Sequence, residues 1–123
     1  MVIYDPKEPV SLSVKEQIKG IVANFIHSLD ASHLMFTIKR LSESGKRLIH
    51  FGAIHDGFAV HACDVKELQE GLRAEFIRIY SNPVLETFFF EQKLEALSID
   101  VPNPPLTGDF NIGSVKDSEY FFC

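Results

Sequence analysis

The sequence has few cysteines, no long apolar run and a shortage of positive charge. Its two cysteines, Cys63 and Cys123, are too few for a disulfide framework or a zinc cage. No apolar run approaches the roughly 20 residues that a transmembrane helix needs. The N-terminus also lacks the basic-then-apolar layout of a signal peptide. We therefore expect a cytosolic chain that does not associate with membranes.

The formal net charge of −5 has the wrong sign for a free-standing nucleic-acid binder, because such binding depends on neutralising phosphates. The imbalance is uneven: residues 1–60 hold 7 basic and 6 acidic side chains, whereas residues 61–123 hold 5 and 11. The first half is therefore nearly neutral, and its basic cluster consists of Lys39, Arg40, Lys46 and Arg47.

Apolar residues are abundant. A hydrophobic content of 46% with 11 phenylalanines is typical of a chain that buries surface, which argues against disorder. A length of 123 residues allows one domain with a modest core.

A predicted β-hairpin at residues 48–61 organises the chain. Its first strand is a continuous apolar run and its second, Phe58–His61, is short, so we expect the first to be buried on both faces. Gly57 can supply the positive φ of a tight reversal, which places Asp56 at the hairpin tip. A rigidly held carboxylate there suits Mg²⁺, which prefers one or two hard oxygen ligands plus substrate phosphates. Asp-Gly is also a common hairpin turn, so Asp56 has a purely structural interpretation as well.

Four helices are predicted around the hairpin, which makes the fold class α+β. Capping-box spacing begins helices at Ser13 and at Asp64, and Asn82-Pro83 reads as a cap followed by proline at the first helical position. The first helix should end near Gly20. A second helix, 22–44, carries apolar residues around much of its circumference, so we expect it to be largely buried.

One strip of that second helix is small and polar. Asn24, His27, Ser28 and Ala31 fall within a narrow arc at helical spacing, where a nucleic-acid backbone could approach closely. The alternative is that His27 is a buried histidine, hydrogen-bonded to its neighbours.

A metal trio of His27, Asp30 and His33 is discounted. Steps of three residues leave the two histidines about 120° apart on a helix, so they do not converge on one ion.

The C-terminal segment combines a stiff linker with an aromatic end. Pro102, Pro104 and Pro105 stiffen residues 102–108. Termini that stay loose are normally polar, whereas this sequence ends in Tyr120–Cys123, three aromatics and a cysteine. We expect the aromatic end to dock on the rest of the fold.

Three blocks of the sequence, in order, resemble the single-subunit DNA-directed RNA polymerases of bacteriophages and mitochondria. The first is Asn24–Leu34, reading NFIHSLDASHL, which is similar to a helix that precedes the palm hairpin in that family. The second is Ile54–Phe58, reading IHDGF, followed by His61–Asp64, reading HACD. The third is the Pro-rich linker with the aromatic end. The resemblance covers the chain from about Val14 onward.

This resemblance implies the C-terminal part of a right-hand polymerase palm at residues 1–101 and a linker with an aromatic tail at 102–123. It implies template-directed nucleotidyl transfer with Mg²⁺, in which Asp56 is catalytic and is one of two metal-binding carboxylates. The implied partners are a DNA template, the RNA product, nucleoside triphosphates and an N-terminal polymerase portion that is missing here.

The resemblance also assigns positions near the nucleic acid or nucleotide. His27 would lie beside the start of the RNA–template hybrid, with Asn24 and Ser28 on the same strip, and His55 would adjoin the metal site. The tail would place Phe122 and Cys123 near the nucleotide-binding region.

Two features depart from the family pattern. Neither the first metal-binding carboxylate nor the fingers helix has a counterpart upstream of the hairpin, so we expect the isolated chain to be inactive. Gly57 replaces the Ser or Cys that usually follows the aspartate, a small-for-small change.

Three alternatives stay open on the sequence alone: a related single-subunit DNA polymerase, a His-Asp metal phosphohydrolase, and a non-catalytic α+β interaction domain. The expected compartment is the cytoplasm, for a virus-encoded protein in a host cell, or the mitochondrion.

Overall fold

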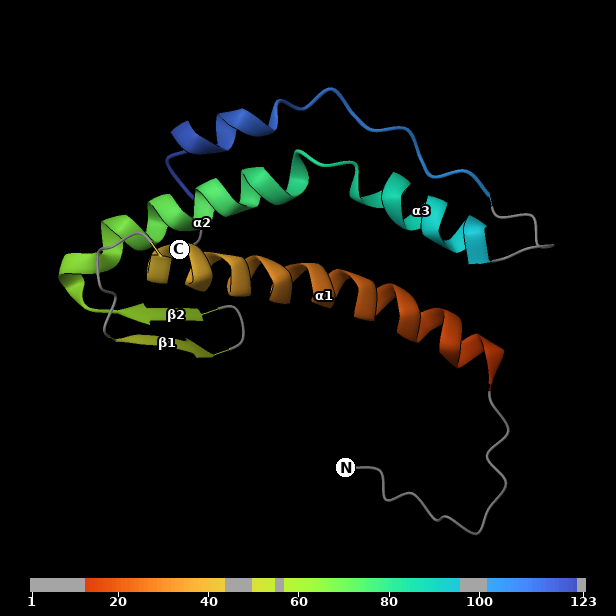
Figure 1. The fold of residues 1–123 in the computed structure, drawn as a ribbon, viewed down its shortest axis with the longest axis horizontal. Coiled ribbons are helices and arrows are strands. Elements are labelled where there is room, and N and C mark those ends of the chain that lie inside the picture. Colours follow the sequence, from red (N-terminus) through yellow and green to blue (C-terminus); the bar gives the residue numbers. More distant parts are fainter. Residues whose placement is uncertain (1–12, 44–49, 55–56, 96–101, 122–123) are drawn as a thin grey trace, which may run out of the picture. The chain divides into compact units, whose positions relative to one another are not determined.

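The computed structural model describes residues 13–43, 50–54, 57–95 and 102–121 (Figure 1). Its elements follow the order α1 (Val14–Glu43), β1 (Phe51–Ile54), β2 (Gly57–Val60), the 3₁₀ turn η1 (Ala62–Asp64), α2 (Val65–Tyr80), α3 (Val84–Glu95) and η2 (Ile112–Asp117). Helices and a two-stranded antiparallel sheet confirm the α+β class. The chain divides into two compact units, residues 1–32 and 33–123.

One helix, α1, replaces the two that were predicted before the hairpin. It runs for 30 residues without a break at Gly20, so the described residues hold three α-helices rather than four. A glycine inside a helix lowers the stability of the helix by only about 1 kcal/mol relative to alanine. The helical turns on either side of Gly20 offset this loss. The predicted start is correct, because the Ser13 hydroxyl accepts from the Glu16 backbone N–H at 3.4 Å.

The prediction that this helix is largely buried is wrong. Within α1 only His33, Thr37 and Leu41 are buried, and Ile26 and Phe36 are 52% and 40% exposed. Apolar residues around a helix show what it can bury, but burial also needs a neighbouring element on each side, and the buried residues of α1 all lie at or after His33.

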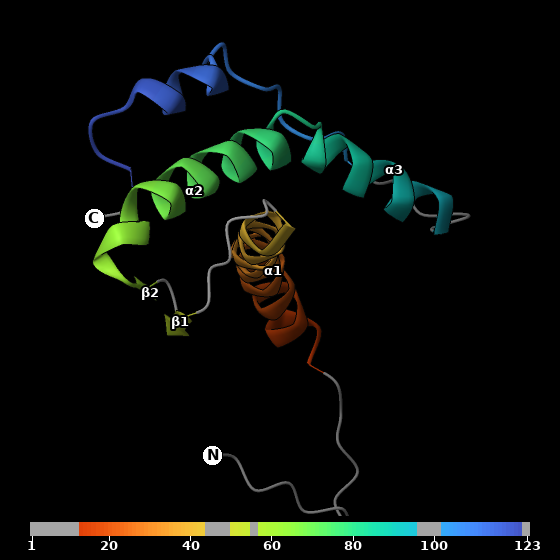
Figure 2. The same ribbon diagram turned by 60° about the vertical axis from the view of Figure 1, so that its left-hand side comes forward.

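The core lies where the end of α1 meets α2. Leu41, Leu68 and Leu72 form its buried cluster. A Cβ on Gly71 would stand 3.0 Å from the Leu41 Cδ2 atom, so the missing side chain lets the two helices approach closely. Figure 2 shows the C-terminal end of α1 beneath α2 in the second unit.

Two predicted caps differ from what the structure shows. Asp64 precedes α2 but its side chain makes no cap hydrogen bond; instead its backbone N–H donates to His61 O at 2.8 Å and closes the 3₁₀ turn. The Asn82 amide donates backward to Arg78 O at 2.6 Å, so it caps the end of α2 and not the start of α3.

No helix within the described ranges is both long enough and apolar enough to cross a membrane.

His33 is a buried polar residue that joins α1 to α2. It is 5% exposed, its Nε2 lies 2.8 Å from Leu72 O, and its ring meets Phe76 edge-on at 5.7 Å between centroids. A buried histidine with one such partner contributes through both packing and hydrogen bonding.

We expect His33→Ala to lower the free energy of unfolding by about 2 kcal/mol, because it removes a buried ring and its hydrogen bond. Urea unfolding followed by circular dichroism measures the change. His27→Ala, on an exposed part of the same helix, is the matched control and should change stability by less than about 0.5 kcal/mol. Equal effects of the two substitutions would contradict this role of His33.

Candidate active site at the β-hairpin

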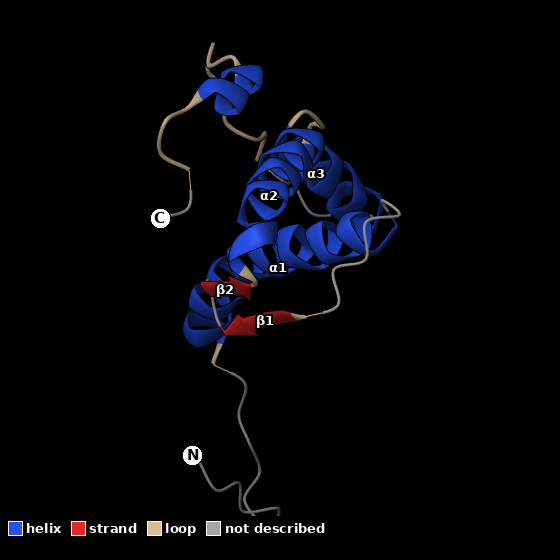
Figure 3. Ribbon diagram, turned by 90° about the vertical axis from the view of Figure 1, so that its left-hand side faces the viewer, coloured by secondary structure: helices blue, strands red, loops and turns tan. Residues whose placement is uncertain are grey.

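The hairpin brackets the His55-Asp56 pair. Strands β1 and β2 form a two-stranded sheet (Figure 3). They pair antiparallel, and the pairing that closes them joins Ile54 to Gly57. His55 and Asp56 are the two residues between these partners in the sequence and lie outside the described residues. The predicted location of the hairpin is therefore confirmed by its two strands, while the placement of Asp56 stays a prediction.

Gly57 lets the two strands approach each other closely, and it does not adopt a left-handed turn conformation. It is the first residue of β2 and its φ lies outside the left-handed region. A Cβ at this position would stand 3.2 Å from the Ile54 carbonyl oxygen, which is tighter than ordinary contact. The expected positive φ is thus wrong, and a side chain at this position would need the Ile54 carbonyl to shift by a few tenths of an ångström.

One face of the hairpin is anchored in the core. Phe51, Phe58 and Val60 pack against the leucine cluster, and the rings of Phe51 and Phe58 meet at 5.9 Å between centroids. The other face is open: Gly52 and Ala59 are exposed, and Ile54 is 78% exposed. The prediction of a strand buried on both faces is wrong for the described residues, because the core covers a single face of this sheet.

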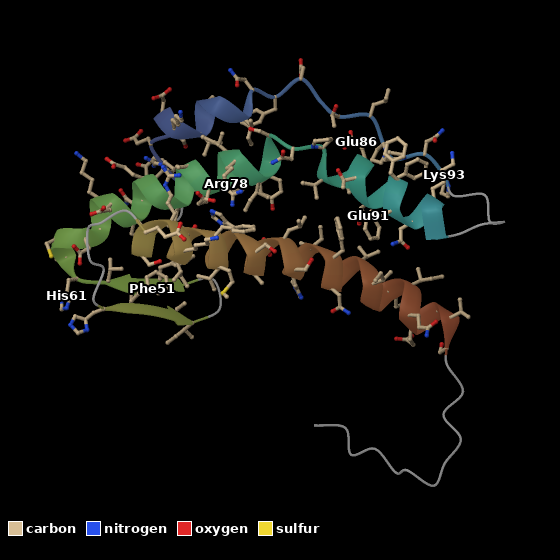
Figure 4. All side chains as sticks on the ribbon, in the orientation of Figure 1. Phe51, His61, Arg78, Glu86, Glu91 and Lys93 are labelled. Atoms are coloured by element: carbon tan, nitrogen blue, oxygen red, sulfur yellow. The ribbon has the colours of Figure 1, made fainter. Side chains whose placement is uncertain are left out.

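Two histidines meet at the open end of the hairpin, at the opposite end of the strands from the pairing of Ile54 with Gly57. The rings of His50 and His61 lie 5.0 Å apart in an edge-to-face arrangement, beside a cleft of about 420 Å³ formed by both strands. Figure 4 shows His61 at this end and Phe51 on β1. Sequence reasoning missed His50, although extending the strand register by one pair beyond Phe51 and Val60 places it opposite His61.

The polar strip on α1 is accessible. Asn24, His27, Ser28 and Ala31 are all exposed, and the Ser28 hydroxyl donates to Phe25 O at 2.7 Å. The alternative interpretation of His27 as a buried, hydrogen-bonded histidine is therefore wrong. The strip belongs to the first unit and the hairpin to the second.

Among the described residues, no three His, Cys, Asp or Glu side chains gather to hold a metal ion. The trio that was discounted on α1 is His27, Asp30 and His33. His33, one of its members, is instead the buried contact to Leu72 O.

The C-terminal segment docks on α2. Val115 in η2 is 8% exposed, and η2 packs against α2. Phe121 contacts the leucine cluster, and its ring lies 5.2 Å from that of Phe76. The expected docking of the aromatic end thus holds for Phe121, whereas Tyr120 is 76% exposed. Phe122 and Cys123 lie outside the described residues.

Arg73 also contacts this segment, and sequence reasoning did not single it out. Its Nη2 donates to Ser118 O at 2.8 Å, and its guanidinium lies 5.9 Å from the centre of the Phe121 ring. Its Nε is buried without a hydrogen-bond partner among the described residues, so the contacts to Ser118 and Phe121 carry the interaction.

Residues 1–98 match the DNA-dependent RNA polymerase family. The chain belongs to this family. It is 38% identical over 118 residues to "DNA-directed RNA polymerase 3B, chloroplastic" of Nicotiana tabacum, an alignment that covers 94% of this chain and 12% of the tobacco protein. It is 42% identical over 111 residues to "DNA-directed RNA polymerase 2, chloroplastic/mitochondrial" of Arabidopsis thaliana, which covers 89% and 10%.

The chain therefore spans about a tenth of the length of these relatives. Their names place them in chloroplasts or mitochondria, as does that of "DNA-directed RNA polymerase 1B, mitochondrial" of Nicotiana tabacum, 36% identical over 94% of this chain and 11% of that protein. No solved structure gives a significant match.

We expect Arg73→Met to release the segment around η2 while α2 stays folded, because methionine keeps much of the stem but loses the hydrogen bond to Ser118. In hydrogen–deuterium exchange, peptides covering 111–121 should exchange about tenfold faster. Lys116→Met, at an exposed position of the same segment, is the control. Unchanged exchange in Arg73→Met would show that Val115 and Phe121 alone hold the segment.

Proposed function

We propose that this chain is the C-terminal palm segment of a DNA-directed RNA polymerase and takes part in template-directed nucleotidyl transfer. The observation that carries the proposal is the family match over residues 1–98, which includes a hairpin closed by the pair Ile54 and Gly57 around His55-Asp56. Because the matching family is one of RNA polymerases, the DNA polymerase alternative loses its support.

Asp56 is proposed as a metal-binding carboxylate. Its chemistry suits Mg²⁺, which takes hard oxygen ligands and keeps open positions for substrate phosphates. The core packing of Phe51 and Phe58 gives the strands on both sides of Asp56 a fixed base. When bound, two such ions stabilise the attacking and leaving oxygens of an in-line displacement.

A second carboxylate is proposed to come from elsewhere in the polymerase, since the first metal-binding carboxylate of the family has no counterpart in the sequence upstream of the hairpin. The proposed enzyme is therefore complete only with the N-terminal portion, together with a DNA template and nucleoside triphosphates, and it yields RNA. Of the two compartments expected from the sequence, the names of the relatives favour the organelle.

The strip on α1 is proposed to contact the nucleic acid. Asn24, His27 and Ser28 are exposed on one arc of the helix, so a strand can reach all three. His27 is assigned to the start of the RNA–template hybrid and His55 to the neighbourhood of the metal site.

The tail is proposed to act near the nucleotide-binding region through Phe122 and Cys123. Its support is the docking of Phe121 against the same leucine cluster that carries the hairpin. The division into a palm segment, 1–101, and a tail, 102–123, is retained as part of this proposal.

The proposal is tested with a chimera in which this chain replaces the matching segment of the tobacco chloroplast polymerase. We expect RNA synthesis by the chimera and none by the isolated chain. In the chimera, Asp56→Asn should lower the synthesis rate by at least about a hundredfold, because it removes a charge that stabilises the transition state. The control is Asp109→Asn, at an exposed position, which should leave the rate unchanged. Full activity of Asp56→Asn would reject the assigned role.

His27→Ala in the same chimera should impair initiation more than elongation and leave thermal stability unchanged, because the side chain is exposed. Abortive-product and run-off assays separate the two phases, and Asp30→Ala, also exposed on α1, is the control. A parallel loss of melting temperature and of both activities would point to a structural role instead.

A further inference from the structure

A cationic cleft of about 460 Å³ lies between the C-terminal turns of α1 and α2. Its lining residues are Phe36, Lys39, Arg40, Glu43, Glu75 and Arg78. All six belong to the second unit, and the cleft takes no residue from the hairpin or from the polar strip.

A buried carboxylate fixes the two arginines. Glu75 is 4% exposed; its Oε1 accepts from Arg40 Nη1 at 3.2 Å and its Oε2 from Arg78 Nε at 2.5 Å. A buried carboxylate is costly unless it is paired, so this pairing holds both guanidinium groups in place. Each contact uses one nitrogen of a group that carries five N–H donors.

Arg78 is held on a second side by an aromatic ring. It extends from α2 toward α1 (Figure 4), and its guanidinium carbon lies 4.4 Å from the centre of the Phe36 ring. Such cation–π contacts orient a guanidinium without consuming its hydrogen-bond donors. The side chains of Arg40 and Arg78 stay 52% and 51% exposed, so donors of both remain accessible from the cleft.

Lys39 adds a third cation at the rim. Its ammonium pairs with Glu43 only at 4.0 Å, and both side chains are 66% exposed, so a stronger anion can displace this contact at little cost. The cleft thus combines three cations with two carboxylates, one of them buried beneath the arginines.

We propose that this cleft binds the backbone phosphates of a nucleic-acid strand. Fixed guanidinium groups are suited to phosphate because their forked donors match its oxygens. A strand is favoured over a free polyphosphate because the cations come from two helices along an open cleft, so successive phosphates can each meet one. That the ligand is a nucleic acid rests on the proposed function. The location of the cleft and the residues that line it do not depend on that function.

The chain offers matched pairs of variants for the test. The exposed ion pair Lys39–Glu43 lies at the cleft, whereas the exposed pair Lys19–Glu16, at 3.4 Å, lies elsewhere on α1. Lys39→Gln and Lys19→Gln change the net charge identically, and so do Glu43→Gln and Glu16→Gln.

The experiment measures binding of a fluorescein-labelled 20-nucleotide single strand to the 123-residue chain by fluorescence anisotropy at several salt concentrations. We expect Lys39→Gln to weaken binding about fivefold and to reduce the salt slope by about 0.7. Glu43→Gln should strengthen binding severalfold because it removes a negative charge from the cleft. Lys19→Gln and Glu16→Gln should change the affinity by less than about twofold. Equal effects at the two ion pairs would overturn the proposal.

The arginines are tested with the triple variant Arg40→Gln, Glu75→Gln, Arg78→Gln, which removes the buried charge together with its partners. It should weaken binding further than Lys39→Gln while keeping the helical circular dichroism. If it unfolds, the Lys39 and Glu43 variants still decide the question.

A competition experiment distinguishes a nucleic-acid strand from a free polyphosphate as the ligand. Unlabelled strand should displace the labelled strand at a far lower phosphate concentration than tripolyphosphate does. Equal potency would identify a free-polyphosphate site and reject a strand. The binding assay does not measure RNA synthesis, so its outcome is independent of the chimera experiment. The cleft can fail to bind a strand while the chimera is active, or bind a strand while the chimera is inactive.

Discussion

The packing of Leu41 on α2 is the contact on which the rest of the second unit depends. Leu41 comes within reach of α2 because Gly71 has no side chain, and with Leu68 and Leu72 it forms the cluster against which the hairpin and the C-terminal segment both rest. A side chain at Gly71 would meet Leu41 within 3.0 Å. One close helix contact therefore sets the base of the candidate active site and the anchor of the tail.

Elements with a strong local pattern could be predicted from the sequence. The capping-box spacing at Asp64 predicted a helix there, and α2 runs from Val65 to Tyr80. The hairpin followed from two short apolar runs around Asp-Gly, a pattern that needs no information from the rest of the fold. Extending its register by one pair places His50 opposite His61, a step that the sequence reasoning did not take.

Features set by neighbouring elements could not be predicted. The apolar residues of α1 suggested burial on all sides, but the pattern within a helix does not say which elements cover it. Asn82 can cap either the helix before it or the helix after it, and only geometry shows that it donates to Arg78 O. The Glu75 pairing joins positions 35 residues apart, a separation that no local motif spans.

Ion pairs bear on which of the described acidic residues can bind a metal ion. A carboxylate that binds a metal ion needs its oxygens free of competing cations. Glu75 is held by two arginines, and Glu16 and Glu43 are paired with lysines. Glu75 is the most deeply buried of these three, yet its oxygens serve to orient guanidinium groups. In the two proposals made above, anion binding falls to the cleft on α1 and α2 and metal binding to the hairpin. Asp56 is the carboxylate that the sequence places between the closing pair of that hairpin.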